Sequence, residues 1–142
     1  HLETVTEEEI QMLGSYKGCS TLLPTAAFFL RMPFQPARKL IDAGAAVTLA
    51  SDFNPGSSPS GNMNLVNAMS CIQMKMLPEE VINASTLNGA YAMELENELG
   101  SITIGKAANL IFTKPIPSLA YLFYSFGSNH IDKVMLKGNW VQ

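Results

Sequence analysis

The sequence feature that most constrains this chain is the stretch Ala46–Asn62, in which a short apolar run gives way to a cluster of turn-forming residues. The run Ala46–Ala50 carries no charge and no polar alternation, which is typical of a parallel strand buried on both faces. The two prolines and two glycines that follow cannot extend a strand ladder. Asp52, the only ionisable residue of the stretch, falls at the junction, where α/β proteins place their active sites. The local pattern leaves two interpretations open: Asp52 is a functional carboxylate, or it caps a turn.

The elements before this stretch are expected to alternate between strand and helix. Thr6 and Glu9 have the spacing of a capping box, which predicts a helix after Thr6. The apolar run Cys19–Thr25 predicts a strand, and the Pro-initiated run Ala37–Ala43 predicts a helix. Residues 1–5 are expected to end a further strand, and residues 26–34 to form a loop or short helix over the strand ends. This order predicts repeated βα units and therefore a parallel sheet.

Three helices are expected after residue 61, and a small β layer after residue 99. Three successive helices would break the βα alternation at the point where a barrel or sheet is completed. Asn109–Phe112 predicts a strand, and residues 134–141 predict a hairpin with Gly138-Asn139 as its turn. The expected helices cover residues 62–76, 78–84 and 86–95. We therefore divide the chain into residues 1–99 and residues 100–142.

Composition and charge exclude several functional classes. The chain has 142 residues, enough for one domain with a core, and a net charge of −3 that offers no basic surface for nucleic acid. No apolar run approaches the ~20 residues that a membrane helix needs. Cys19 and Cys71 lie far apart without ligand-like spacing, so we expect free thiols and a cytoplasmic location. The expected partner is a small molecule, without nucleic acid or membrane.

Five motifs together resemble the amidohydrolase superfamily. They are Ala50–Ser57, Thr86–Ala90, Gly100–Leu110, Leu22–Ala26 and Met32–Phe34. The resemblance covers essentially the whole chain and implies an α/β fold: the C-terminal part of a (β/α)8 barrel, about strands six to eight, plus part of a small β-sandwich domain. The Asp52–Ser57 loop narrows the resemblance to a hydrolase of histidine degradation that opens the ring amide of an imidazolone propionate.

The resemblance also implies roles for individual residues. Asp52 corresponds to the eighth-strand metal ligand and proton shuttle, with one divalent zinc or iron ion as cofactor. Asn54, Gly56 and Ser57 correspond to the substrate-binding loop; the other interpretation is an ordinary Ser/Pro/Gly loop. His1 corresponds to the sixth-strand histidine that faces the substrate, or is a terminal residue without a role.

The other metal ligands of the superfamily have no counterpart here. No His-x-His pair occurs, and the only histidine besides His1 is His130. The resemblance and the absence of an initiator Met lead us to expect a piece of a longer chain that is inactive alone and whose parent is a homodimer. Two rival hypotheses are another cyclic amidohydrolase or deaminase, and a non-catalytic module that buries its open sheet edges against a partner.

Several chemically capable residues are interpreted as structural. Arg31 could meet a substrate carboxylate, but a surface salt bridge is the simpler expectation. His130 is expected on the surface of the tail and Cys71 in the core. Glu7–Glu9 are interpreted as a solvated helix start that suits the helix dipole.

Overall fold

The structure, a computed structural model, describes residues 1–141 and consists of short helices and two small sheets. None of the described helices is long and apolar enough to cross a membrane. In chain order the elements are α1 (Glu7–Gly14), β1 (Cys19–Leu22), α2 (Pro24–Leu30), α3 (Ala37–Asp42), β2 (Ala46–Leu49), α4 (Met63–Ile72), α5 (Pro78–Ser85), α6 (Leu87–Ala92), β3 (Leu110–Thr113), α7 (Leu119–Tyr124), β4 (Ile131–Leu136) and β5 (Asn139–Val141).

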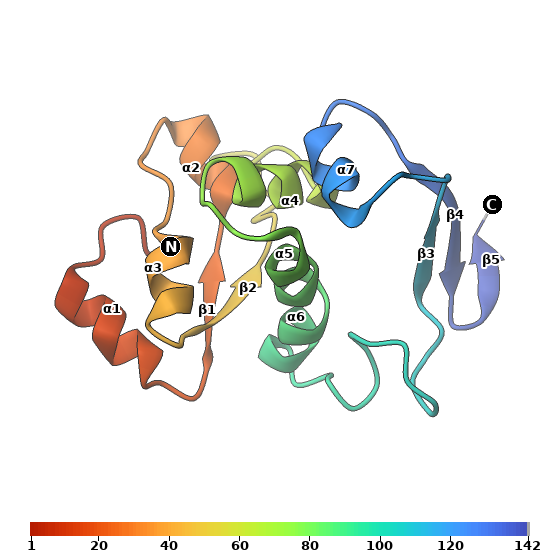
Figure 1. Cartoon of the computed structure of the whole chain (residues 1–142), viewed down its shortest axis with the longest axis horizontal. Coiled ribbons are helices and arrows are strands. Elements are labelled where there is room, and N and C mark those ends of the chain that lie inside the picture. The colour runs from red at the N-terminus through yellow and green to blue at the C-terminus, as the bar shows by residue number, and fades with distance from the viewer. Residues whose placement is uncertain (142) are drawn as a thin grey trace.

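The first sheet confirms the predicted parallel pairing. β1 and β2 run parallel from Cys19 opposite Ala46 to Leu22 opposite Leu49, with α2 and α3 in the connection between them. Figure 1 shows this βαβ unit in the half of the molecule that contains the N-terminus. The strand expected in residues 1–5 is wrong: these residues form a turn, because Leu2 has a φ of 68° that no strand ladder accommodates.

Local sequence signals explain where α1 and α2 begin. The Thr6 hydroxyl accepts from the Glu9 amide at 3.2 Å and the Glu9 carboxylate accepts from the Thr6 amide at 2.7 Å, which confirms the capping box of α1. Pro24 starts α2, so the predicted strand through Thr25 is three residues too long. Pro fits the first turn of a helix because the amide it lacks would have no partner there.

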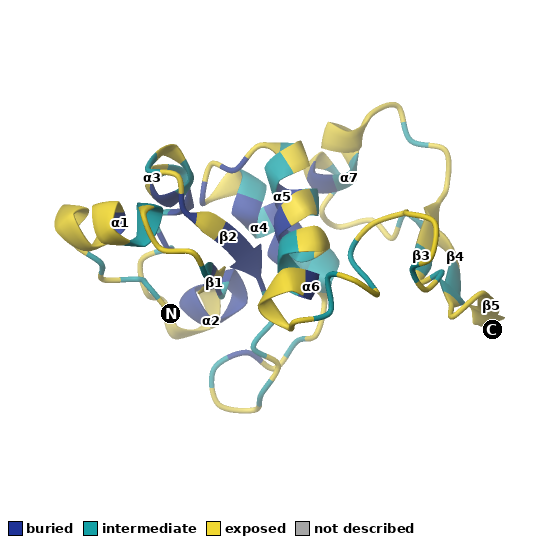
Figure 2. Ribbon diagram, turned by 90° about the horizontal axis from the view of Figure 1, so that it is seen from below, coloured by how far each residue is buried: buried dark blue, intermediate teal, exposed yellow. Residues whose placement is uncertain are grey.

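The core lies between β1, β2 and the helices around them. Its fully buried members include Leu22, Leu40, Val66 and Val81. Figure 2 shows the buried residues concentrated in β1, β2, α2 and α4. The sequence analysis missed α7, whose Phe123 is 3% exposed and belongs to this core.

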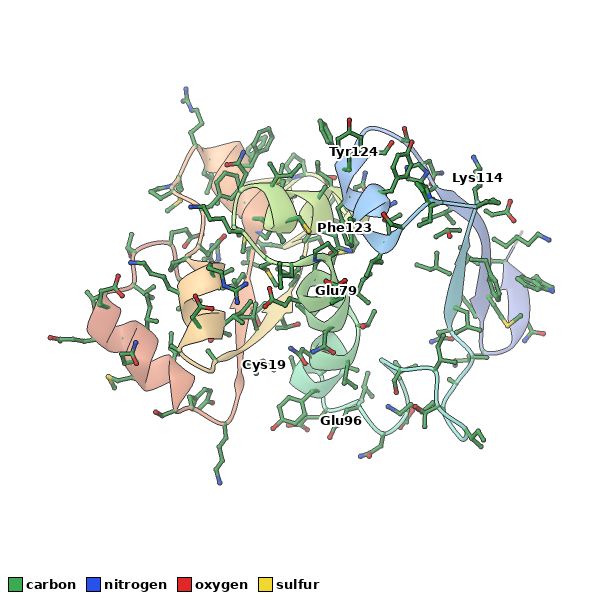
Figure 3. All side chains as sticks on the ribbon, in the orientation of Figure 1. Cys19, Glu79, Glu96, Lys114, Phe123 and Tyr124 are labelled. Atoms are coloured by element: carbon green, nitrogen blue, oxygen red, sulfur yellow. The ribbon has the colours of Figure 1, made fainter. Side chains whose placement is uncertain are left out.

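The position of α7 follows from one anchoring side chain. Figure 3 shows Phe123 on the inner side of α7, where the helix packs on α4 and α5, and Tyr124 on its outer side. Ser118 caps α7 by accepting from the Tyr121 amide at 3.3 Å. The tail after residue 113 is thereby fastened to the core.

The second sheet has the antiparallel order β3-β4-β5 and lies at the opposite end of the molecule from α1 (Figure 1). The predicted hairpin is confirmed, but its turn is Lys137-Gly138, not Gly138-Asn139. Lys137 and Gly138 have φ values of 48° and 80°, the left-handed pair that a two-residue hairpin turn requires. Most residues of this sheet are exposed (Figure 2).

Two of the three helices between the sheets end earlier than predicted. α4 ends at Ile72 and α6 at Ala92, where the sequence analysis expected helices to residues 76 and 95. Lys75 and Glu94 have positive φ values of 58° and 59°, which end the helical hydrogen-bond pattern before those residues.

Candidate functional site

Asp52 lies just beyond the carboxyl end of the parallel pair. The Ala50 amide donates to the Leu22 carbonyl at 3.2 Å, which prolongs the β1–β2 ladder by one bond before the chain leaves it. Asp52 is half-buried and has a φ of 50°, in the left-handed region. The structure thus confirms that Asp52 lies at the carboxyl end of the parallel strands, as predicted.

Asn54 organises the loop that follows Asp52. Its Oδ1 accepts from the amides of Gly56 at 2.8 Å and Ser57 at 2.9 Å. Its Nδ2 donates to the Asp52 carbonyl at 2.6 Å and to the Ser57 hydroxyl at 2.8 Å. The backbones of Asn54 and Ser58 close the loop with a reciprocal pair of hydrogen bonds at 3.0 and 3.3 Å. The Asn54 amide, predicted to bind substrate, is therefore engaged within the loop.

Ser57 is the loop residue that reaches the Asp52 carboxylate. Its hydroxyl donates to Oδ2 of Asp52 at 3.1 Å and lies 3.2 Å from Oδ1 of Asn54. Gly56 is exposed, and a Cβ at its position would stand 3.3 Å from Oδ1 of Asn54. A side chain there would crowd the acceptor that holds the loop together.

Two buried hydroxyls meet on the peptide group just before Asp52. The Thr25 hydroxyl, at the start of α2, donates to the Ser51 carbonyl at 3.0 Å. The Ser58 hydroxyl donates to the same carbonyl at 2.6 Å. Thr25 is 3% and Ser58 1% exposed. The sequence analysis missed both roles, because no local motif indicates a hydroxyl that bonds to a distant carbonyl.

His1 lies in a different polar cluster. Its Nδ1 is 3.4 Å from Oε1 of Glu3, and the same oxygen accepts from Nε2 of Gln35 at 3.0 Å. Gln35, 1% exposed, also donates to the Leu23 carbonyl at 3.3 Å. The structure records no hydrogen bond or ion pair between His1 and Asp52 among residues 1–141. The sequence analysis did not identify Glu3 or Gln35 as members of this cluster.

The remaining candidates take structural positions. Arg31 is exposed at the end of α2 and forms none of the ion pairs found in residues 1–141, so the predicted salt bridge is absent there. The ring of His130 lies 5.5 Å from that of Tyr121, and its Nε2 is buried with no hydrogen-bond partner among residues 1–141, so this half-buried residue is less exposed than expected. Cys71 packs against the core, and burial raises the pKa of its thiol to about 11.

A metal site cannot be built from the described residues alone. Among residues 1–141 no three His, Cys, Asp or Glu side chains stand close enough to share an ion. Asp52 suits a divalent cation as one carboxylate ligand, but one ligand does not hold zinc or iron. The residues present therefore do not fit a complete metal centre.

The family follows from comparison with known proteins. The model of the amidohydrolase family matches residues 1–141. The chain therefore belongs to the amidohydrolase family, whose members generally depend on a metal ion.

The similar proteins are more specific. The chain is 52% identical over 141 residues to the imidazolonepropionase of Christiangramia forsetii, covering 99% of this chain and 34% of that protein. It is 54% identical over 138 residues to the imidazolonepropionase of Flavobacterium johnsoniae, covering 97% and 34%. The chain thus spans about a third of the length of these curated relatives.

A solved structure supports the fold. The chain superposes on a zinc-bound adenosine deaminase of Xanthomonas campestris with a TM-score of 0.85 over 99% of this chain and 35% of the deaminase. At 23% sequence identity, this similarity supports the fold alone. The predicted α/β amidohydrolase fold is confirmed.

Proposed function

We propose that the complete protein containing this chain is an imidazolonepropionase, which hydrolyses the ring amide of 4-imidazolone-5-propanoate to N-formimidoyl-L-glutamate. The observation that carries the proposal is Asp52 in its closed Asn54–Ser58 loop, at the carboxyl edge of a parallel sheet. The identity of 52–54% to two imidazolonepropionases supports the choice of substrate.

Within the complete protein, residues 1–99 would form about strands six to eight of a (β/α)8 barrel with their helices. Residues 100–142 would belong to a small β-sandwich domain, which agrees with the separate β3–β5 sheet. We propose a homodimeric, cytoplasmic enzyme that acts on a small molecule and binds neither nucleic acid nor membrane. The net charge of −3 supports the absence of a nucleic-acid surface.

Asp52 is proposed as the acid–base residue of the hydrolysis. Its carboxylate takes a proton from the attacking water and returns it to the ring nitrogen as the C–N bond breaks. One divalent cation, zinc or iron, with Asp52 among its ligands, would supply polarisation of the ring carbonyl and a more acidic water. Since the other ligands are absent from residues 1–141, this chain alone is expected to be inactive.

The loop and His1 are proposed to orient the substrate. Asn54 contributes by holding the loop, since its amide is engaged internally, while Gly56 and Ser57 form the edge available to the substrate. His1 would steady the negative charge that develops on the ring oxygen. The contact of its Nδ1 with Glu3 leaves Nε2 available for that task.

The test is a hydrolysis assay on the complete protein. We expect turnover of imidazolonepropionate, and a loss of roughly 10²–10⁴-fold in kcat for Asp52→Asn, the usual contribution of a general acid–base group. Asp132→Asn, a matched change at an exposed residue of β4, should leave kcat unchanged.

Two controls separate the rival functions. A panel of other cyclic amides and aminopurines tests the alternative amidohydrolase or deaminase; a preference for one of them over imidazolonepropionate would refute our assignment. Turnover by residues 1–142 alone would refute the proposal that the remainder of the site lies elsewhere. The absence of turnover by the complete protein, together with association of this chain with a partner, would favour a non-catalytic module.

A further inference from the structure

We propose that Thr25 and Ser58 are positioning residues that set the direction of the Asp52 carboxylate by jointly holding the Ser51 carbonyl. The inference rests on the proposed function in that it takes Asp52 to be the reacting carboxylate. It adds two residues to the machinery of the reaction, one of them from outside the Asp52 loop.

The geometry of the two bonds carries the proposal. The Ser51 oxygen accepts from Thr25 at 3.0 Å and from Ser58 at 2.6 Å, so two donors occupy the two lone pairs of one carbonyl. Both side chains are at least 97% buried, and Thr25 comes from the start of α2, directly beyond the end of β1. The two hydroxyls therefore hold Ser51 from the side of α2 and from the far end of its own loop.

The orientation of the Ser51 carbonyl restricts the orientation of Asp52. The peptide group that joins the two residues is planar, so fixing the direction of its C=O also fixes the direction of the Asp52 N–H. The place of the Asp52 Cβ then depends on its φ, which stands at 50°, a value that residues with a side chain adopt only against a steric cost; the two side-chain torsions direct the carboxylate itself. Beyond Asp52, Asn54 holds its carbonyl and Ser57 holds Oδ2. The carboxylate is thus restrained on both sides and at one of its own oxygens.

A purely structural explanation would need only one of the two hydroxyls. A buried carbonyl is satisfied by a single donor, as Thr48 shows by donating once to the Ala84 carbonyl at 2.9 Å. The Ser70 hydroxyl donates at 2.8 Å to the Val66 carbonyl, four residues back in its own helix. Thr48 and Ser70 are as deeply buried as Thr25 and Ser58, but their bonds do not lead to Asp52. They provide matched controls.

The experiment uses Thr25→Val and Ser58→Ala in the complete protein, with Thr48→Val and Ser70→Ala as controls. We measure kcat and KM with imidazolonepropionate, and the dissociation constant of Zn²⁺ by competition with a chelator. In both test variants kcat should fall and the zinc dissociation constant should rise, each by roughly 10–100-fold, as for other residues that orient a metal ligand. KM should change much less, because neither hydroxyl touches the substrate. Thr25→Ser should restore both values.

A further readout does not depend on catalysis. Amide hydrogen exchange, followed by mass spectrometry, should become faster in residues 51–58 of both test variants and stay unchanged there in both controls. Equal losses of kcat and zinc affinity in test and control variants, or unchanged exchange at residues 51–58, would overturn the positioning role. If Thr25→Val does not fold, Ser58→Ala decides the matter, since it removes a single oxygen atom.

The two proposals fail in distinguishable ways. A complete protein that binds zinc but does not hydrolyse imidazolonepropionate refutes the proposed substrate and leaves the zinc and exchange measurements to decide the positioning role. A complete protein that hydrolyses imidazolonepropionate equally well with and without the two hydroxyls refutes the positioning role alone.

Discussion

Replacing Glu80 with glutamine is expected to destabilise the protein at neutral pH, because Glu80 serves two elements at once. Its Oε2 accepts from the Leu77 amide at 2.7 Å, at the start of α5, and from Nη1 of Arg38 at 2.9 Å. Its Oε1 accepts from Nη2 of Arg38 at 3.0 Å, which completes a two-pronged ion pair between α5 and α3. Arg38 also pairs with Asp42 on its own helix.

The magnitude follows from these contacts. The side chains of Arg38 and Glu80 are 31% and 25% exposed, so water screens the pair only in part. A partly exposed pair contributes up to about 1 kcal/mol, and weakening a helix cap costs about 0.5 kcal/mol or more. We therefore expect Glu80→Gln to lower the free energy of unfolding by about 1–2 kcal/mol.

The lowered pKa of Glu80 determines how its contribution to stability changes with pH. The hydrogen bonds from Arg38, with a smaller contribution from the Leu77 amide, hold the pKa of Glu80 below its ordinary value although burial opposes them. A lowered pKa means that the stabilisation is present above the unfolded pKa of about 4.3 and is lost as the pH falls through the folded pKa. The wild type and Glu80→Gln should therefore differ most in unfolding free energy at pH 7, and this difference should disappear as the pH falls below about 4.

The assay is urea unfolding followed by circular dichroism between pH 3 and pH 7. Glu79→Gln is the matched control, because Glu79 lies in the same first turn of α5 but is exposed and forms none of the ion pairs of residues 1–141. The reasoning is refuted if Glu80→Gln destabilises no more than Glu79→Gln, or if the difference persists undiminished at pH 3.

Three further predictions follow from local geometry. Gly100→Ala should lower the unfolding free energy by more than Gly105→Ala in urea titrations: both glycines have positive φ, but only at Gly100 would a Cβ meet neighbours, the nearest at 2.7 Å. Cys71 should react with iodoacetamide at pH 8 far more slowly in the folded protein than in urea, because burial raises the pKa of its thiol to about 11; equal labelling rates by mass spectrometry would contradict this. Thr6→Ala should cost about 1 kcal/mol by removing the cap of α1, and Thr6→Ser should restore it.

Elements marked by a local chemical signal were predictable from the sequence. The capping box of Thr6 and Glu9 begins α1, and the uncharged run before Asp52 forms β2. The position of Asp52 at the sheet edge follows from the abrupt change between that run and its turn-forming loop. The capping box is a contact between residues three apart, and the change from an apolar run to turn formers marks the end of β2 although the strand pairs with the distant β1.

Features set by distant contacts were not predictable. The run that forms α7 is almost wholly apolar and shows no helical periodicity; the burial of Phe123 against α4 and α5 explains its position. The role of Thr25 depends on the parallel pairing that brings the start of α2 beside Ser51. The misplaced hairpin turn has another cause, since Gly138-Asn139 and Lys137-Gly138 are both acceptable locally and the register of β4 and β5 selects between them.

The loop around Asp52 is almost self-contained, and this has a consequence for inheritance. Within the part of the chain that the structure describes, residues 51–58 form their hydrogen bonds with one another, apart from the bond that Thr25 supplies. We expect such a segment to keep its shape when recombination transfers it to a related protein. The recipient must have a hydroxyl at the end of the neighbouring strand, as Thr25 provides here. Thr25 would be the compatibility requirement for such a transfer, and a designer grafting the loop onto another parallel sheet would need to install both parts together.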